Sequence, residues 1–254
     1  MIAYEYPFNE RVRTLLRLEK LFEKAAYFIE QQGWREHHVV LLSLFEILEV
    51  AGRADLKSDL IQELERQRQS LLTFRDNPDI SEEKLSGALY EIEQSSAALL
   101  AMTGKIGQYL RENDWLMAIK SRAVIPGGVC QFDLPSYHYW SNQEADVRRQ
   151  ALQEWLQPLT PLRDGLSIVL RLLRASGTAE QQLARNAYFQ LMLSGGASQM
   201  VCVSLKKQLP FIPEISANKY ALNIRFIRQD LDGSRQRQTD NTVDVPFHIM
   251  FCNL

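Results

Sequence analysis

The dominant spacing of the apolar residues changes close to Gly177, and this change limits the folds that the chain can adopt. Before it, apolar residues recur three or four positions apart, as in Leu166, Leu170 and Leu173, which is the period of an amphipathic helix. After it, apolar residues alternate in short runs such as 201–205, which is the period of a strand. This order predicts an α+β protein: a mainly helical domain of long antiparallel helices, plus a smaller antiparallel β domain.

The helical period predicts seven helical stretches, over residues 9–32, 36–51, 55–74, 81–104, 105–124, 142–155 and 160–177. Asn9, Asp55 and Ser81 stand at the starts of three stretches. Asparagine, aspartate and serine are residues that cap helix N-termini, so these positions support the predicted starts.

The stretch 105–124 is the least regular of the seven. It contains Gly107 and the pair Asn113-Asp114, so the sequence is compatible with one helix or with two. One continuous helix would place Arg111 and Arg122 on the same face, because they are 11 residues apart, which is about three turns.

Alternating runs predict one strand near the N-terminus and four after Gly177, over residues 2–6, 188–193, 201–205, 220–228 and 243–252. Four successive strands predict an antiparallel meander. Ser194-Gly195-Gly196 and Asp230-Leu231-Asp232-Gly233 are predicted turns, and the segment Pro210 to Pro213 is expected to break the alternating run. Pro246 indicates that the last strand lies at a sheet edge or contains a bulge.

One segment between the predicted helices, Ile125 to Pro135, has two prolines and two adjacent glycines. These residues stop helices, and the alternating Gly128-Phe132 segment predicts a strand that joins the β domain. We therefore expect two domains. The helical, dimer-forming domain comprises 9–124 and 141–177, and the β-rich domain comprises 1–8, 125–140 and 178–254.

Composition and charge exclude several classes of protein. The chain is 46% hydrophobic and 24% charged, which suffices for a sizeable core, and its net charge of -2 lacks the basic excess of a general nucleic-acid binder. Cys130, Cys202 and Cys252 are far apart without CxxC spacing, so we expect no disulfide or zinc site and a reducing cytoplasm. With no secretory leader and no apolar run of about 18 residues, we expect no membrane insertion.

Sequence motifs for catalysis or cofactor binding are absent. The chain has no glycine-rich phosphate loop, no HExxH zinc motif and no GxSxG motif. Ser81-Glu82-Glu83-Lys84 matches SxxK but stands at a predicted helix start, and His37 and His38 have no further ligands at metal-binding spacing. We therefore expect a protein that binds other molecules without catalysis, a cofactor or a metal ion.

The first predicted helix carries four cations on the side opposite its apolar face, spaced 4, 3 and 4 residues apart: Arg13, Arg17, Lys20 and Lys24. We call these four residues the basic stripe. The stripe is typical of a solvated helix face paired with Glu10, Glu19 and Glu23. It is also suited to a carboxylate-bearing peptide, because arginine presents a forked set of donors that matches a carboxylate.

His138 lies among Tyr137, Tyr139 and Trp140. The ordinary interpretation is a half-buried core histidine. In a pocket, the same imidazole would donate to an acidic ligand while the aromatic rings supply apolar contact.

Several of these segments resemble the ZapD family, the bacterial Z-ring-associated proteins that bind FtsZ. The likeness covers nearly the whole chain and is strongest in the central motif, where Ile125-Pro126-Gly127-Gly128 leads to Phe132-Asp133-Leu134-Pro135 and His138-Tyr139-Trp140. Further matching segments are Asn9-Glu10, Arg13-Thr14, Leu16-Arg17-Leu18-Glu19, Ile106 to Glu112, Asn186 to Phe189, and Pro213 to Ser216 with Lys219.

The resemblance implies a cytoplasmic, mid-cell division protein that forms a homodimer and binds the C-terminal tail peptide of FtsZ in a positively charged pocket. Arg17 and His138 match family positions implicated in binding the tail. A third position, which can be arginine in the family, is Asp114 here, so Arg111 or Arg122 would replace it. The predicted tail-binding residues are Arg17, His138, Arg111, Arg122, Arg13 and Lys20.

Two tail sites on a symmetric dimer would cross-link and bundle FtsZ filaments, and so promote assembly of the Z-ring, without any chemical step. The apolar face from Leu56 to Phe74 is a candidate dimer contact. An alternative of another class is a small-molecule-binding protein or enzyme, in which His138 and the basic residues bind an anion in a pocket between the two domains.

Overall fold

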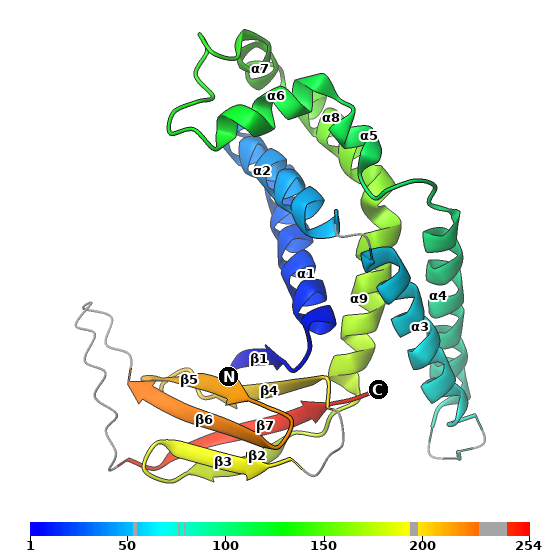
Figure 1. Cartoon of the computed structure of the whole chain (residues 1–254), viewed down its shortest axis with the longest axis vertical. Helices are drawn as coiled ribbons and strands as arrows, with labels where there is room; N and C mark the ends of the chain where they lie inside the picture. Colours follow the sequence, from blue (N-terminus) through cyan, green and yellow to red (C-terminus); the bar gives the residue numbers. More distant parts are fainter. Residues whose placement is uncertain (53–54, 76, 79, 194–197, 229–242) are drawn as a thin grey trace. The chain divides into compact units, whose positions relative to one another are not determined.

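The chain divides into two compact units in the computed structural model (Figure 1), which describes residues 1–52, 55–75, 77–78, 80–193, 198–228 and 243–254. The β unit comprises Met1–Arg13 and Arg171–Leu254, and the helical unit comprises Thr14–Leu170. Both boundaries fall inside helices. The predicted α+β class, with a helical part and a smaller antiparallel β part, is confirmed.

The helices begin and end close to the predicted positions. They are α1 (Glu10–Ile29), α2 (Trp34–Ala51), α3 (Leu56–Leu72), α4 (Glu82–Ala101), α5 (Gln108–Arg111), α6 (Asp114–Ala123), α7 (Pro135–Ser141), α8 (Ala145–Leu156), the short 3₁₀ helix η1 (Gln157–Leu159) and α9 (Thr160–Ala175). The stretch 105–124 forms two helices, α5 and α6, and not one continuous helix. The short helix α7 is not predicted by the sequence pattern.

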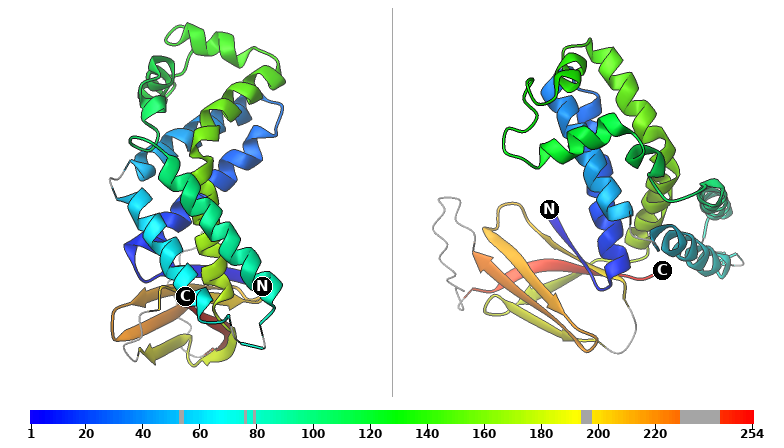
Figure 2. Two further views of the ribbon diagram at one scale, coloured as in Figure 1. Left: turned by 90° about the vertical axis from the view of Figure 1, so that its right-hand side faces the viewer. Right: turned by 45° about the horizontal axis from the view of Figure 1, so that its top comes forward.

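Helices α3 and α4 lie alongside each other (Figure 2), and α9 packs against both. Leu60 of α3 and Leu99 of α4 are fully buried, and their methyl carbons lie 3.0 Å from the place of a Cβ atom at Gly165 of α9. Leu56 and Leu64 are also buried within the single chain. Most of the apolar face predicted as a dimer contact is therefore used inside the helical unit.

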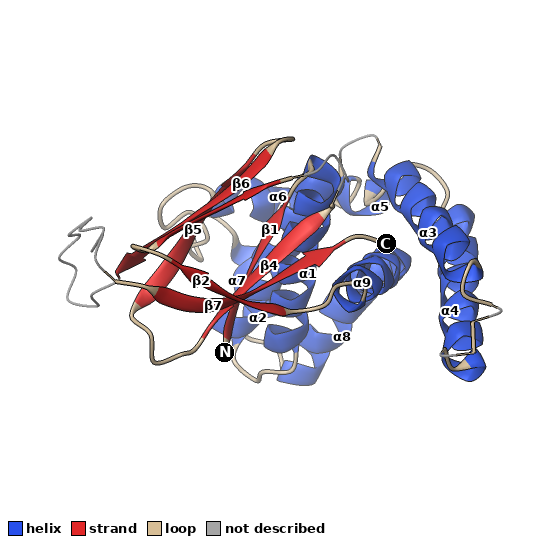
Figure 3. Cartoon of the chain, turned by 90° about the horizontal axis from the view of Figure 1, so that it is seen from below, coloured by secondary structure: helices blue, strands red, loops and turns tan. Residues whose placement is uncertain are grey.

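The β unit contains two antiparallel sheets rather than one meander (Figure 3), so the predicted meander is wrong. The first sheet has the order β1 (Ile2–Pro7), β4 (Met200–Leu205), β7 (Val245–Cys252), β2 (Glu180–Ala184). The second has the order β3 (Tyr188–Met192), β6 (Ala221–Arg228), β5 (Phe211–Ala217). Apolar residues from both sheets form one buried core, including Val203, Ile249, Ile224 and Phe226.

The sequence pattern does not predict β2 and β5, and both are edge strands. β2 consists mainly of polar residues, and β5 contains Pro213, which an edge strand tolerates because one side of its backbone needs no partner. Pro246 lies in β7, which is an inner strand, but the register pairs β4 with β7 only from His248 onward. Pro246 is therefore paired on one side, with Leu183 of β2.

The Gly128-Phe132 segment forms turns in the helical unit and belongs to none of the strands in the described ranges, so its predicted place in the sheet is wrong. Gly127 has a positive φ of 71°, and the amide of Gly128 donates to the Ile125 carbonyl at 2.8 Å. A Cβ atom at Gly128 would lie 2.3 Å from the carbonyl oxygen of Arg122, so the chain folds back against the end of α6. Turn geometry overrides the short alternating pattern.

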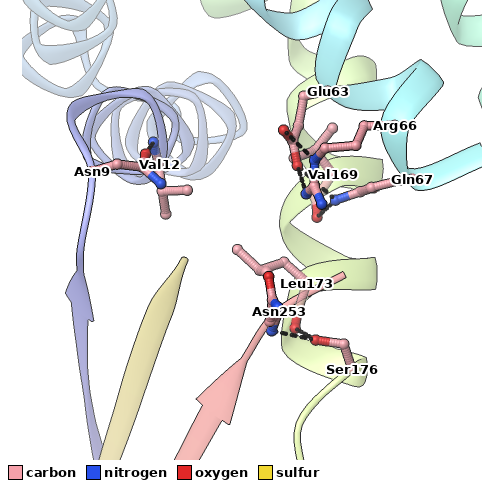
Figure 4. Close-up of polar contacts among 9 residues, drawn as sticks. All are labelled: Asn9, Val12, Glu63, Arg66, Gln67, Val169, Leu173, Ser176 and Asn253. Carbon is pink, nitrogen blue, oxygen red and sulfur yellow. Dashed lines mark hydrogen bonds and ion pairs between the residues drawn. The ribbon is translucent and has the colours of Figure 1, made fainter. Parts of the chain in front are cut away.

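Polar contacts fix several helix ends and packing contacts (Figure 4). The Asn9 side chain accepts from the Val12 amide at 2.8 Å, which confirms the predicted cap of α1, and the Ser81 side chain caps α4. Asp55 makes no side-chain cap, so that prediction is wrong. Gln67 of α3 donates to the Val169 carbonyl of α9 at 3.1 Å, which joins two helices that are far apart in sequence.

Within the β unit, the last turn of α9 is tied to the first sheet. Arg174 donates to both carboxylate oxygens of Glu5 on β1, at 2.6 and 2.9 Å. The three cysteines carry free thiols, and burial raises the pKa of Cys202 and raises that of Cys252 to about 11. The predicted turns Ser194-Gly195-Gly196 and Asp230-Leu231-Asp232-Gly233 lie outside the described residues.

A pair of glycine substitutions tests the packing of α3, α4 and α9. Gly165→Val should destabilise the protein by about 1–3 kcal/mol, because the added side chain meets atoms only 3.0 to 3.2 Å from the Cβ position. Gly87→Ala in α4 should stabilise it by up to about 1 kcal/mol, because Gly87 has open space around it and alanine favours the helix. Urea denaturation measures both. Equal stability of the two variants would contradict this packing.

Candidate functional site

The basic stripe lies along α1 with its charged groups at the surface. Arg17 is exposed, and the Lys20 side chain is 70% exposed. Arg13 pairs with Glu10 at 3.2 Å, Lys20 with Glu23 at 2.7 Å, and Lys24 with Glu46 of α2 at 3.3 Å. Pairing with glutamates, which is typical of a solvated face, is thus present along the stripe, although the partner of Lys24 is Glu46 of α2 and not a residue of α1. Exposed ion pairs of this kind contribute only about 0–1 kcal/mol to stability, so an acidic ligand can replace the glutamate partners at small cost.

Arg111 supports the local structure. Its guanidinium donates to the carbonyl oxygens of Leu48, at 2.6 Å, and Ile106, at 2.8 Å. Leu48 lies in the last turn of α2, where the helix dipole favours a cation, and its carbonyl also accepts from the Gly52 amide at 2.9 Å. Arg111 therefore holds α5 against the end of α2, and a ligand would have to compete with these bonds.

Arg122 and Arg111 do not share a helix face, because α5 ends before Asn113 and Asn113 caps α6 by accepting from the Leu116 amide at 3.0 Å. Arg122 is exposed in the last turn of α6, and Asp114 is exposed in its first turn. An ion pair between Lys120 and Glu49 holds α6 beside α2, and this contact lowers the pKa of Glu49.

His138 is exposed on α7, so the interpretation as a half-buried core residue is wrong. The buried face of α7 is formed instead by Tyr137 and Trp140, which pack with Trp115 of α6 at centroid distances of 6.4 and 5.8 Å. Trp155 of α8 completes this aromatic cluster, 5.3 Å from Trp115. The cluster anchors α7 and leaves His138 facing solvent.

Tyr137 also joins α7 to α2. Its hydroxyl lies 2.8 Å from Nδ1 of His38, and burial raises the pKa of Tyr137 to about 12 and lowers that of His38. Both shifts favour the neutral groups, so the contact is a hydrogen bond between an uncharged hydroxyl and an uncharged imidazole.

The structure does not bring Arg17 and His138 into one compact pocket. α7 packs at the N-terminal end of α2, through Tyr137 and His38. The same end of α2 contacts the last turn of α1, where His37 Nε2 lies 3.3 Å from the Ile29 carbonyl oxygen. Arg17 precedes Ile29 by 12 residues, which corresponds to about 18 Å of helix. A ligand that reaches both ends must be extended.

A buried arginine that the sequence analysis missed fixes this end of the surface. Arg148 of α8 donates from Nε to Nδ1 of His37 at 3.0 Å and from Nη2 to the Gln32 carbonyl at 2.6 Å. Its Nη1 donates to the carbonyls of Ser141 and Gln143. Desolvation, followed by the charge of Arg148, lowers the pKa of His37. Arg148 and Arg149 are adjacent in the sequence, and no sequence pattern shows which of the two is buried.

A half-open groove of about 310 Å³ lies on the side of α1 opposite the basic stripe. Its apolar lining comes from Phe22, Ala25, Ala26, Ile29 and Leu156, and its polar lining from Glu30, Gln153, Gln157, Thr160 and Arg163. The predicted tail-binding residues are not among its lining residues, so the groove is separate from the candidate surface.

In the described parts of the chain, no helix combines the length and apolarity needed to cross a membrane. The same residues contain no group of three or more histidine, cysteine, aspartate or glutamate side chains arranged to hold a metal ion.

Comparison with known proteins identifies the family. The family model described as "ZapD: Cell division protein" matches residues 16–225. The chain belongs to the ZapD family. It is 66% identical to "Cell division protein ZapD" of Dechloromonas aromatica (strain RCB), over all of both chains. It is 62% identical to the protein of that name from Aromatoleum aromaticum (strain DSM 19018 / LMG 30748 / EbN1), covering all of this chain and 98% of the relative. Identity to the Azoarcus sp. (strain BH72) protein is 61% over all of both chains.

The family membership confirms the resemblance found in the central motif and assigns the chain a role in cell division. Among the predicted tail-binding residues, those exposed to solvent are Arg17, Lys20, Arg122 and His138. Arg111 instead donates hydrogen bonds within the fold.

Acid should destabilise the helical unit. The pKa values of His37 and His38 are lowered in the folded protein, whereas in the unfolded chain both would titrate near 6.5. The unfolded state therefore binds more protons below about pH 6.5, so stability is complete above this pH and falls as the pH falls through and below it.

Urea denaturation at pH 7.5 and pH 5.5 checks this expectation. A His37→Gln/His38→Gln variant should lose less stability between the two pH values than the wild-type protein. His138→Gln, which removes an exposed imidazole, should lose as much as the wild type. An unchanged acid response in the double variant would contradict the assignment.

Proposed function

We propose that this protein is a non-enzymatic adaptor of cell division that binds the C-terminal tail of FtsZ and cross-links FtsZ filaments in the Z-ring. Membership of a family of cell division proteins supports the division role. The observation that carries the tail-binding site is the row of cations on α1, with Arg17 and Lys20 exposed on one face of a rigid helix.

The basic stripe has the chemistry of a site for an acidic peptide. Arg17 offers a planar, forked donor set that fits a carboxylate in two parallel hydrogen bonds. Lys20 and Lys24 offer point charges whose present partners, Glu23 and Glu46, lie at the surface. These groups lie on one helix, so binding costs the ordering of the peptide and the exchange of the exposed ion pairs with Glu23 and Glu46.

The remaining predicted residues take different roles in this proposal. His138 and Arg122 are exposed and would contact a more distant part of an extended tail. Arg111 would act as a positioning residue, since its bonds to Leu48 and Ile106 place the α5–α6 segment.

Bundling would follow from bivalency. A homodimer carries two equivalent tail sites, and once one site is occupied the second meets its tail at high effective concentration. Each site can then be weak, which keeps cross-links reversible, and no chemical step is needed. The proposed location is the cytoplasm at mid-cell, with the Z-ring.

The charge reversal Arg17→Glu tests the site. It should weaken binding of an FtsZ tail peptide at least about tenfold and remove co-sedimentation with FtsZ filaments, because a repulsive charge replaces the carboxylate-binding fork. Binding by the wild-type protein should also weaken with added salt.

Arg163→Glu is the matched control, because Arg163 is an exposed arginine of the helical unit that lines the separate groove. It makes the same change in net charge and should bind normally. A folded Arg17→Glu protein that binds and bundles like the wild type, or equal losses in both variants, would refute the assignment.

The bivalent mechanism requires a dimer in solution. Light scattering at micromolar concentration should give about twice the mass of the 29.3 kDa chain. A monomer at this concentration that still bundles filaments would contradict the bivalent mechanism. Tail binding itself is tested separately by Arg17→Glu.

A further inference from the structure

We propose that Tyr27 forms the apolar end of the tail-binding surface on α1 and makes the surface selective for an acidic peptide that also carries a bulky apolar residue. This inference rests on the proposed function, because it assigns a specificity residue to the same surface. Tyr27 follows Lys24 by three residues and Lys20 by seven, so it continues the basic stripe along one face of the helix.

The Tyr27 ring is exposed at the surface but held in place. Tyr27 as a residue is 65% exposed, and its ring packs edge-on against the half-buried Phe28, with centroids 5.1 Å apart and an angle of 89° between the planes. The backbone carbonyl of Tyr27 accepts from the Gln31 side chain at 3.2 Å. A single exposed tyrosine is ordinary on a protein surface. Here the two rings together form an apolar platform directly beside a row of cations.

The charge of the stripe determines which partner fits the platform. A peptide on this face has to bring carboxylates to Arg17, Lys20 and Lys24, and its next residues then lie over Tyr27 and Phe28. Aromatic side chains contribute large contact area at low entropic cost and are frequent energetic centres of interfaces. The cations alone would bind any acidic segment, so the platform supplies the discrimination.

The length of α1 sets the spacing of the ligand groups. Tyr27 lies ten residues after Arg17, which is about 15 Å along the helix axis. An extended peptide covers this distance in about five residues. The surface therefore fits a peptide whose acidic and bulky apolar residues are about five positions apart.

Fluorescence anisotropy with two synthetic peptides tests this inference. One is the FtsZ C-terminal tail, and the other is the same tail with its bulky apolar residues replaced by serine. The wild-type protein should bind the unmodified tail at least about tenfold more tightly than the serine version. Tyr27→Ala should reduce this difference to about twofold or less, with the weaker, salt-sensitive binding retained, and Tyr27→Phe should keep the difference.

Tyr90→Ala is the matched control, because Tyr90 is a 62% exposed tyrosine on another helix of the same unit, α4. It should discriminate like the wild type. Arg17→Glu should weaken binding of both peptides.

The outcomes separate this inference from the function on which it rests. If the wild-type protein binds both peptides equally and Arg17→Glu binds neither, the apolar platform is refuted and the tail site stands. If Tyr27→Ala keeps the full difference, the apolar residues are bound elsewhere and the inference is refuted. If the wild-type protein binds neither peptide, the proposed function fails and this inference fails with it.

Discussion

The buried guanidinium of Arg148 is the interaction on which the helical unit most depends. Its described acceptors are all neutral: the His37 ring and the carbonyls of Gln32, Ser141 and Gln143. A buried cation is costly unless its donors are satisfied, and removing one partner leaves a desolvated charge. These bonds connect α8, the end of α7 and the start of α2, so they hold the His138 end of the candidate surface in place.

Buried and exposed charges have different roles in this protein. Arg148 and Arg111 are bonded to backbone carbonyls and position helices. Lys20 and Lys24 form exposed pairs with glutamates, which are weak and screened by salt. A ligand can replace the partner of an exposed cation without unfolding part of the chain, but it cannot replace the partners of a buried one. This difference is why the proposed site lies on the exposed face of α1 and not at the arginines with the most hydrogen bonds.

Much of the fold could be predicted from local patterns, because a helix or an inner strand with one buried face repeats apolar residues at its own period. The elements that the patterns miss show this period only weakly, because they are short, polar or interrupted by proline. β2 and β5 are edge strands with polar residues or proline, and α7 is a helix of seven residues that buries Tyr137 and Trp140. The Gly128-Phe132 segment alternates like a strand, yet Gly127 and Gly128 fold it into turns against Arg122. Backbone geometry decided that case.

The sequence by itself determined the family, the α+β class and the row of cations on α1, because these depend on residue order and helical period. Only the tertiary structure decided which arginines serve the fold and which face solvent. Arg111 caps α2 because the chain brings Leu48, Ile106 and Arg111 together, and no spacing along the sequence records that convergence. The separation of Arg17 from His138 likewise depends on which end of α2 receives α7. Charge is a property of the residue, whereas its availability depends on the groups that the fold places around it.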